Sequence, residues 1–320
     1  MTLFPCAPVV LMGYRRPLLT ANVFQAIRAA RPPVLFLVMD GPNKREPDDQ
    51  EAVNATRDVV ENIDWETEVY RIYAEENLGL RVRVSSGLDE VFDVVDEAII
   101  LEDDCLPSAD FFRFATELLE KYRSDERVGL ISGFSRLRGR TVSEYSYDFS
   151  RDVRIWGWAT WGRTWKSFSS SGDLTRQVSE GERAALIEQF PEGPRKRSME
   201  KMLSHSAALD SWALPFAVHC ISRGYLNPVP MKNLVSNIGL GASSTHTQFR
   251  SWVAEVPRES LNFPLAHPSH VLHNDELDRA EGREDMKVLV RFPLRHPLQA
   301  VSRVVSYLLL RLARRRAAQS

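Results

Sequence analysis

The feature that most constrains this chain is an alternation, over its first half, of short apolar runs with longer amphipathic stretches. This rhythm is typical of βαβ units, which build a mostly parallel sheet flanked by helices. Two runs, VLFLVM and AIIL, are apolar at every position, as expected for strands buried on both faces. We therefore predict an α/β fold with strands at 8–13, 34–39, 68–73, 98–101 and 128–132 and helices at 18–30, 48–63, 80–95 and 109–123.

The composition fits a folded globular protein and gives no sign of nucleic-acid binding. The 320 residues are 43% hydrophobic, enough for a sizeable core. Lys and Arg total 41 against 43 Asp and Glu, a balance that gives no reason to expect nucleic acid as a partner. The charge is unevenly spread, because residues 286–320 contain eight basic residues and no acidic one.

Cysteine usage and the apolar segments bear on the compartment. Cys6, Cys105 and Cys220 are odd in number and widely spaced, which favours neither a disulfide framework nor a zinc site and suggests a cytoplasmic protein. The N-terminal apolar stretch contains prolines and lacks a preceding basic region, so we interpret it as a first strand rather than a signal peptide. No apolar run approaches the ~18 residues of a membrane-spanning helix.

Acidic residues follow two of the predicted strands directly. Asp40 follows VLFLVM, and Glu102-Asp103-Asp104 follows AIIL. Open α/β sheets bind ligands outside the carboxyl ends of their strands. Three consecutive carboxylates repel one another unless a cation or hydrogen-bond donors neutralise them. Mn²⁺ or Mg²⁺ would do so and would suit a diphosphate ligand. The alternative is that the motif merely ends a strand and caps the next helix, with Ser108 as a candidate N-cap.

The segment AIILEDDCLPSADFF resembles the strand, Glu-Asp-Asp motif and following helix of glycosyltransferases with the GT-A fold, in particular the N-acetylglucosaminyltransferase I-like group and its bacterial relatives, including family 2-like enzymes. Further segments are similar in the same order: VVLMGYRRP, LVMDGP, ENLGLRVRVSSGLDEVF and RIWGWATWGRTW. The resemblance covers roughly residues 8–250. It implies a GT-A domain with a nucleotide-sugar-binding half (1–135), an acceptor-binding and catalytic half (136–255) and a C-terminal extension (256–320).

The resemblance also implies roles for individual residues. Asp104 would be the direct metal ligand, and Glu102 and Asp103 would hold the ribose and metal-bound water. His246 would return to the metal or the pyrophosphate, although it could be an ordinary loop histidine. The donor nucleotide would be contacted by Tyr14, Arg15, Asp40, Asn77 and Arg81, together with Glu102 and Asp103.

Asp210 is the candidate general base for the acceptor hydroxyl. It interrupts an apolar stripe at helical spacing, so burial would raise its pKa toward a useful range. The alternative is a helix N-cap, because Pro215 cannot sit comfortably in a helix interior.

Aromatic residues cluster in WGWATWGRTW, and Trp156, Gly157 and Trp158 are candidates for an acceptor platform, since sugar C–H faces pack on aromatic rings. Core packing is the alternative, and we expect Trp161 and Trp165 to be structural. The basic amphipathic C-terminal segment would contact an anionic membrane surface or else dock on the body.

Together these features predict transfer of a sugar, with inversion, from a nucleoside-diphosphate sugar to a glycan or lipid-linked glycan in surface polysaccharide synthesis. A sugar-nucleotide nucleotidyltransferase would need a Gly-rich phosphate loop near the N-terminus, and the chain has none. Dehydrogenase and P-loop signatures are absent too. A carbohydrate-binding or sugar-nucleotide-binding protein of the same fold without transferase activity remains the alternative from another class.

Overall fold

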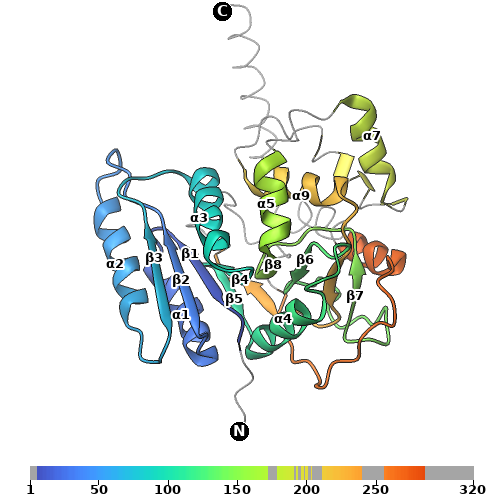
Figure 1. Ribbon diagram of the computed structural model, residues 1–320, viewed down its shortest axis with the longest axis horizontal. Coiled ribbons are helices and arrows are strands. Elements are labelled where there is room, and N and C mark those ends of the chain that lie inside the picture. Colours follow the sequence, from blue (N-terminus) through green and yellow to red (C-terminus); the bar gives the residue numbers. More distant parts are fainter. Residues whose placement is uncertain are drawn as a thin grey trace, which may run out of the picture.

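The computed structural model describes residues 6–171, 179–190, 192–193, 196–197, 199–200, 203, 211–239 and 256–284. A six-stranded sheet in the order β3-β2-β1-β4-β8-β6 lies at its centre (Figure 1). Strands β1 to β4 pair in parallel, and β8 is antiparallel to both of its neighbours. These six strands are β1 (Val9–Gly13), β2 (Val34–Met39), β3 (Glu68–Tyr73), β4 (Glu97–Glu102), β6 (Leu130–Ser132) and β8 (Trp158–Trp161).

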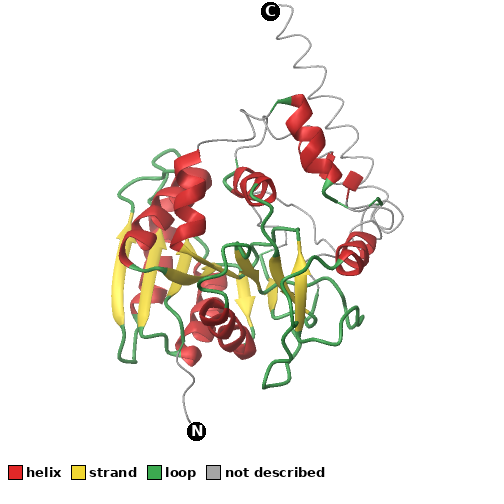
Figure 2. Cartoon of the chain, turned by 45° about the vertical axis from the view of Figure 1, so that its right-hand side comes forward, coloured by secondary structure: helices red, strands yellow, loops and turns green. Residues whose placement is uncertain are grey.

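Helices cover both faces of this sheet (Figure 2). One apolar core joins the sheet to α1, α2 and α4, and a second joins the opposite face to α3, α5 and α9. The labelled helices are α1 (Pro17–Ala30), α2 (Asp49–Glu61), α3 (Leu80–Val94), α4 (Ala109–Lys121), α5 (Gly162–Ser171), α7 (Glu180–Glu188) and α9 (Ala213–Ser222).

The two cores explain why the central strands are apolar at every position. Successive side chains of a strand point to opposite faces. In β2, Leu35 and Leu37 enter the first core, whereas Phe36 and Val38 enter the second. β1 and β4 behave in the same way, so both faces must be apolar.

The predicted α/β fold with a mostly parallel central sheet is confirmed. The five predicted strands and four predicted helices of the first half are present, with boundaries that shift by at most two residues. Ser108 occupies the N-cap position of α4, but its side chain makes no capping hydrogen bond. The sequence thus predicted where this helix begins, but the expected capping hydrogen bond from the Ser108 side chain is not formed.

Two small antiparallel sheets extend the second half of the chain. β5 (Cys105–Pro107) pairs with β10 (Val235–Asn237), and β7 (Tyr147–Ser150) pairs with β9 (Asn227–Pro230). The first of these sheets begins directly after the acidic triplet and brings β10 alongside it.

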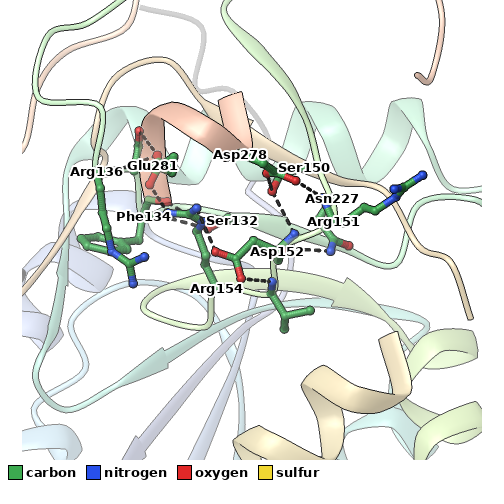
Figure 3. Close-up of polar contacts among 12 residues, drawn as sticks. Ser132, Phe134, Arg136, Ser150, Arg151, Asp152, Arg154, Asn227, Asp278 and Glu281 are labelled. Atoms are coloured by element: carbon green, nitrogen blue, oxygen red, sulfur yellow. Dashed lines mark hydrogen bonds and ion pairs between the residues drawn. The ribbon is translucent and has the colours of Figure 1, made fainter. Parts of the chain in front are cut away.

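A helix at 275–284 docks beside β7 and β9 through buried carboxylates (Figure 3). Asp278 accepts a hydrogen bond from Ser150, and Glu281 pairs with Arg154. His273 Nε2 lies 2.7 Å from the same Asp278 carboxylate. Because the carboxylate sits between the serine and the histidine, this arrangement is structural and is not a Ser-His-Asp triad.

The cysteines and the helices bear on two expectations that the sequence raised. All three cysteines lie in the described part of the chain and are free, so the expectation that they form no disulfide framework is confirmed. None of the helices described in the structure is long and apolar enough to cross a membrane. The basic segment 286–320 lies outside the described residues.

Candidate functional site

The acidic triplet lies at the carboxyl edge of the parallel strands. Glu102 is the last residue of β4 and pairs in register with Met12 of β1. Asp103 and Asp104 form the turn into β5. Asp40 directly follows β2, on the other side of β1, and therefore lies at the same edge. Ligands of open α/β sheets bind at this edge.

Arg16 binds two of the three carboxylates. Its Nε lies 3.2 Å from Oδ2 of Asp103, its Nη2 pairs with Oδ1 of the same residue, and its Nη1 lies 2.9 Å from Oδ2 of Asp104. Arg16 directly precedes α1, and its carbonyl accepts hydrogen bonds from the backbone and the hydroxyl of Thr20. Sequence reasoning selected Tyr14 and Arg15 from this loop and missed Arg16. Nothing local in the sequence marks Arg16, because its partners follow β4, a strand that only the order of the sheet places beside β1.

One guanidinium does not neutralise three carboxylates. Burial and the neighbouring charges of Asp104 and Asp103 raise the pKa of Glu102 to about 8. Burial also raises the pKa of Asp103 to about 6, in spite of the opposing effect of Arg16. Burial is the largest cause of both shifts, and repulsion among the three carboxylates adds to it. The site would therefore favour an additional cation.

Strand β10 supplies the other wall around Asp104. Asn237 Nδ2 lies 3.2 Å from Oδ1 of Asp104, and the backbone N–H of Ile238 donates to the Asp104 carbonyl at 2.8 Å. A Cβ on Gly239 would lie 2.4 Å from Oδ2 of Asp104, so only glycine fits there. Sequence reasoning did not select Asn237 or Gly239, since nothing local in the sequence reveals that β10 pairs with β5.

The carboxylate oxygens of Asp103 and Asp104 suit a divalent ion that is also coordinated by phosphate oxygens. Carboxylate oxygens are the ligands that Mg²⁺ and Mn²⁺ prefer. Among the described residues, no group of three or more His, Cys, Asp or Glu side chains is arranged to hold a metal ion by itself. Mg²⁺ commonly binds through one or two carboxylates plus substrate phosphates. Asp104 and Asp103 fit a site of this kind, in which substrate phosphates complete the coordination of the ion.

Asp40 organises the loop before α3. Its carboxylate accepts hydrogen bonds from Asn77 Nδ2 at 3.0 Å and from the backbone N–H groups of Gly41, Leu78 and Gly79 at 2.8 to 3.1 Å. The structure thus brings together Asp40 and Asn77, two of the predicted donor-binding residues. Asp40 is only 4% exposed. Its carboxylate is already hydrogen-bonded to these four nitrogen atoms of the chain.

Tyr14 and Arg15 converge on a carboxylate outside the triplet. The Tyr14 hydroxyl and Arg15 Nη1 both bind Asp49 in the first turn of α2, the latter at 2.7 Å. The backbone N–H of Asn43 donates to the same carboxylate at 2.6 Å. Asp49 therefore ties the loop after β1 to the loop after β2, and Arg15 remains the most exposed member of the group.

Two arginines lie near the start of α3. Arg81 is partly buried, whereas Arg83 is 7% exposed and its closest acidic partner is Glu90, at 3.6 Å. Within the described residues, Nε and Nη2 of Arg83 have no hydrogen-bond partner. Sequence reasoning selected Arg81 and missed Arg83. The helical spacing of Arg83 with Gly87 and the other buried residues of α3 could have revealed it.

The two tryptophans of the candidate acceptor platform differ in burial. Trp158 is 1% exposed and packs in the core, stacked on Trp212 with ring centroids 5.9 Å apart. Trp156 is partly buried, and its ring centroid lies 4.7 Å from that of Phe134. Of the two, only Trp156 therefore offers an indole surface to a ligand. Trp161 and Trp165 are buried, as expected of structural residues.

Gly157 connects this region to the acidic edge. Its backbone has φ +61°, and a Cβ there would lie 2.6 Å from a methyl group of Val235. Both properties require glycine. Val235 begins β10, whose last residue, Asn237, binds Asp104. Trp156 is therefore placed next to the strand that lines the acidic site.

Two predicted site residues, Asp210 and His246, lie outside the described residues. Their roles as general base and metal ligand stay predictions. The helix that Asp210 was expected to cap begins at Ala213, with Trp212 at its N-cap position.

No family model matches the chain, and no curated protein sequence matches it. Among solved structures, it is similar to the mannosyltransferase PcManGT from Pyrobaculum calidifontis in complex with GDP-Man and Mn²⁺, with 15% identity, 68% of this chain and 74% of that chain covered, and a TM-score of 0.35.

Two further similarities have lower scores. A cytidylyltransferase from Leptospira borgpetersenii serovar Hardjo-bovis has 9% identity, 52% and 64% coverage and a TM-score of 0.31. A mannose-1-phosphate geranyltransferase from Thermus thermophilus has 13% identity, 71% and 74% coverage and a TM-score of 0.28.

Proposed function

We propose that the protein is a glycosyltransferase that moves a sugar from a nucleoside-diphosphate sugar to a hydroxyl of a glycan or lipid-linked glycan, in bacterial surface polysaccharide synthesis. The observation that carries this proposal is the acidic triplet at the carboxyl edge of the sheet, the edge at which Asp40 also lies. Oxygen ligands, excess negative charge and the adjacent start of α1 suit a divalent ion shared with a diphosphate.

The chain's own residues would divide the work of binding the donor. Asp104 and Asp103 would hold Mn²⁺ or Mg²⁺, an ion that, when bound, supplies Lewis-acid stabilisation of a leaving diphosphate. Asp40 would position Asn77 and the start of α3 for the nucleoside. The N-terminus of α1 offers the positive end of a helix dipole, which favours an anion.

The acceptor side depends on Trp156 and on Asp210. A partly exposed indole beside β10 would offer a flat apolar surface to a sugar ring. Asp210 would accept the proton of the attacking hydroxyl, which implies inversion at the anomeric carbon. For Asp210→Asn we expect donor binding to be retained and transfer to fall by roughly 10²-fold or more, the usual scale of a general base. Equal turnover in this variant would remove Asp210 from the mechanism.

A thermal-shift screen tests the donor class directly. Nucleoside diphosphates and their sugars are added with and without Mn²⁺, because a ligand that binds only the folded state raises the melting temperature. We expect at least one nucleoside diphosphate to stabilise the protein in the presence of Mn²⁺ and much less in its absence. No shift with any of them would overturn the proposal.

Product analysis then separates the alternative activities. A glycosyltransferase releases nucleoside diphosphate when acceptor is added. A nucleotidyltransferase would instead form sugar nucleotide and pyrophosphate from a nucleoside triphosphate and a sugar phosphate. A protein that binds the donor and produces neither belongs to the binding class. We also propose that the protein is cytoplasmic and that residues 286–320 contact a membrane surface. Vesicle co-sedimentation would test the membrane contact.

A further inference from the structure

Arg16 occupies the carboxylates that the proposed function assigns to a divalent cation. We propose that Arg16 is an exchangeable counter-ion: its guanidinium pairs with Asp103 and Asp104 in the free protein and moves to the diphosphate when cation and donor bind together. The inference rests on the proposed function, because it requires a cation at Asp104. It adds a specific positioning role for a residue of the first loop.

A metal ion at Asp104 would lie against the guanidinium of Arg16. Arg16 binds both oxygens of Asp103 and Oδ2 of Asp104. The remaining oxygen of Asp104 accepts a hydrogen bond from Asn237. A metal ion needs lone pairs of these same oxygens and would be repelled by a guanidinium in contact with them. Arg16 in this position therefore opposes binding of the ion at Asp104, and the ion binds best when Arg16 leaves.

The backbone of Arg16 is fixed, but its side chain can move. Thr20 holds the Arg16 carbonyl through two hydrogen bonds of 2.9 Å, and Pro17 restricts the next position. The Arg16 side chain is 24% exposed, whereas those of its partners Asp103 and Asp104 are 3% and 12% exposed. Rotation of the side chain alone would carry the guanidinium toward solvent at the start of α1.

A diphosphate would give the displaced guanidinium a new partner. Anions are favoured at the N-terminus of α1, which begins one residue after Arg16. The planar, multiply donating guanidinium matches phosphate oxygens well. The cation and the diphosphate would therefore bind with positive coupling. The diphosphate gives the displaced guanidinium a new partner, and the cation releases the guanidinium from the carboxylates so that it can bind the diphosphate.

Mn²⁺ titrations without nucleotide test the exchange, with free Mn²⁺ measured by electron paramagnetic resonance. The variant is Arg16→Gln, and the control is Arg28→Gln, which removes an equal charge from the last turn of the same helix, where Arg28 pairs with Asp64. We expect Arg16→Gln to bind Mn²⁺ about tenfold more tightly than the wild type, because a competing charge is gone. Arg28→Gln should stay within about twofold.

The coupling to nucleoside diphosphate gives a second readout. In the wild type, adding nucleoside diphosphate should tighten Mn²⁺ binding by about tenfold or more, and this enhancement should shrink in Arg16→Gln. Mn²⁺ affinity in Arg16→Gln that is weaker than in the wild type, or equal to that in Arg28→Gln, would show that Arg16 is a fixed support and would overturn the inference. Circular dichroism of both variants verifies that they fold.

Crystals of the wild type with Mn²⁺ and nucleoside diphosphate decide the matter if Arg16→Gln does not fold. The inference expects the Arg16 guanidinium off Asp104 and on a phosphate oxygen, and a guanidinium still on both carboxylates would overturn it. The proposed function fails separately: if the wild type binds neither Mn²⁺ nor nucleoside diphosphate, both proposals fall. If it binds them together and Arg16 stays in place, only the exchange is wrong.

Discussion

Arg16 and Asp103 form a two-point ion pair across 87 positions of sequence, through Nε and Nη2 of the guanidinium and both oxygens of the carboxylate. The pair joins the loop after β1 to the turn after β4, two strands that lie side by side in the sheet. An acidic triplet that would otherwise repel itself is thus partly compensated by the chain. The remaining negative charge is what a divalent ion would meet.

Asp104→Asn should remove binding of nucleoside diphosphate that depends on Mn²⁺. The substitution keeps an oxygen that can accept the hydrogen bond from Asn237 but removes the charge that a divalent ion needs. Isothermal titration calorimetry with nucleoside diphosphate and Mn²⁺ measures the effect. Glu97→Gln, at the other end of β4, is the matched control and should bind normally. Unchanged affinity in Asp104→Asn would exclude Asp104 as the ligand.

Gly239→Ala should disturb the same carboxylate by contact alone. The added methyl group would lie 2.4 Å from Oδ2 of Asp104, so one of the two must move. We expect a loss of stability of about 1–3 kcal/mol from overpacking and weaker binding of nucleoside diphosphate with Mn²⁺. Gly181→Ala is the control: its Cβ would meet nothing, and alanine in helix α7 should stabilise the protein slightly. Equal behaviour of the two variants in denaturation and binding would contradict the prediction.

Asp40→Ala should destabilise the protein and loosen the loop before α3. Four donors, including the backbone N–H groups of Leu78 and Gly79, would lose their shared acceptor. Because buried donors without partners are costly, we expect a loss of about 2–4 kcal/mol in chemical denaturation. Asp93→Ala removes an exposed carboxylate near Lys166 and should cost well under 1 kcal/mol. Similar losses in both variants would show that the Asp40 network contributes little.

Trp158→Ala and Trp156→Ala should separate packing from surface recognition. Trp158 is fully enclosed by Trp212, Phe216 and their neighbours, so its truncation should cost about 3–5 kcal/mol. Trp156 is partly exposed and should cost clearly less. Urea denaturation of both variants measures the difference. A larger loss for Trp156 would mean that its indole is a core residue and would remove it as an acceptor surface.

His219 should make stability depend on pH below neutrality. Burial, with a smaller contribution from Arg223, lowers its pKa to about 4. The unfolded chain takes up a proton near the ordinary pKa, whereas the folded protein does not. Stability from this residue is therefore present above about pH 6.5 and is lost as the pH falls toward 4. At pH 5 the loss should reach about 1–2 kcal/mol.

His219→Phe tests this dependence. The variant keeps an aromatic ring beside Phe168 and Tyr225 but cannot titrate. We expect the wild type to lose more stability than the variant between pH 7 and pH 5 in urea denaturation. Parallel curves over that range would rule out His219 as the source.

Much of the first half of the chain could be predicted because its signals are local. Apolar runs such as VLFLVM must be buried on both faces, and helix boundaries follow from nearby residues. The position of Glu102-Asp103-Asp104 at a strand end followed from the same pattern. Asp40 and Asn77 were selected separately, and the structure shows that they are hydrogen-bonded to each other.

The missed residues share a different cause. Arg16 and Asn237 were passed over because their importance depends on which strands are neighbours. Spatial neighbours that are distant in sequence leave no local mark. Trp158 illustrates the same point, since WGWATW is compatible with an exposed platform or a buried core until α9 is placed against it.

The sequence by itself determined the alternation of strands and helices, the apolar faces and the acidic cluster at a strand end, because periodicity and strand-end position are properties of consecutive residues. Only the tertiary structure decided that Arg16 pairs with Asp103 and Asp104, that Gly239 leaves space for a carboxylate, and that Trp156 rather than Trp158 reaches the surface. These features arise where separate loops meet at one edge of a sheet, and strand order, which pairs residues far apart in the chain, fixes that meeting.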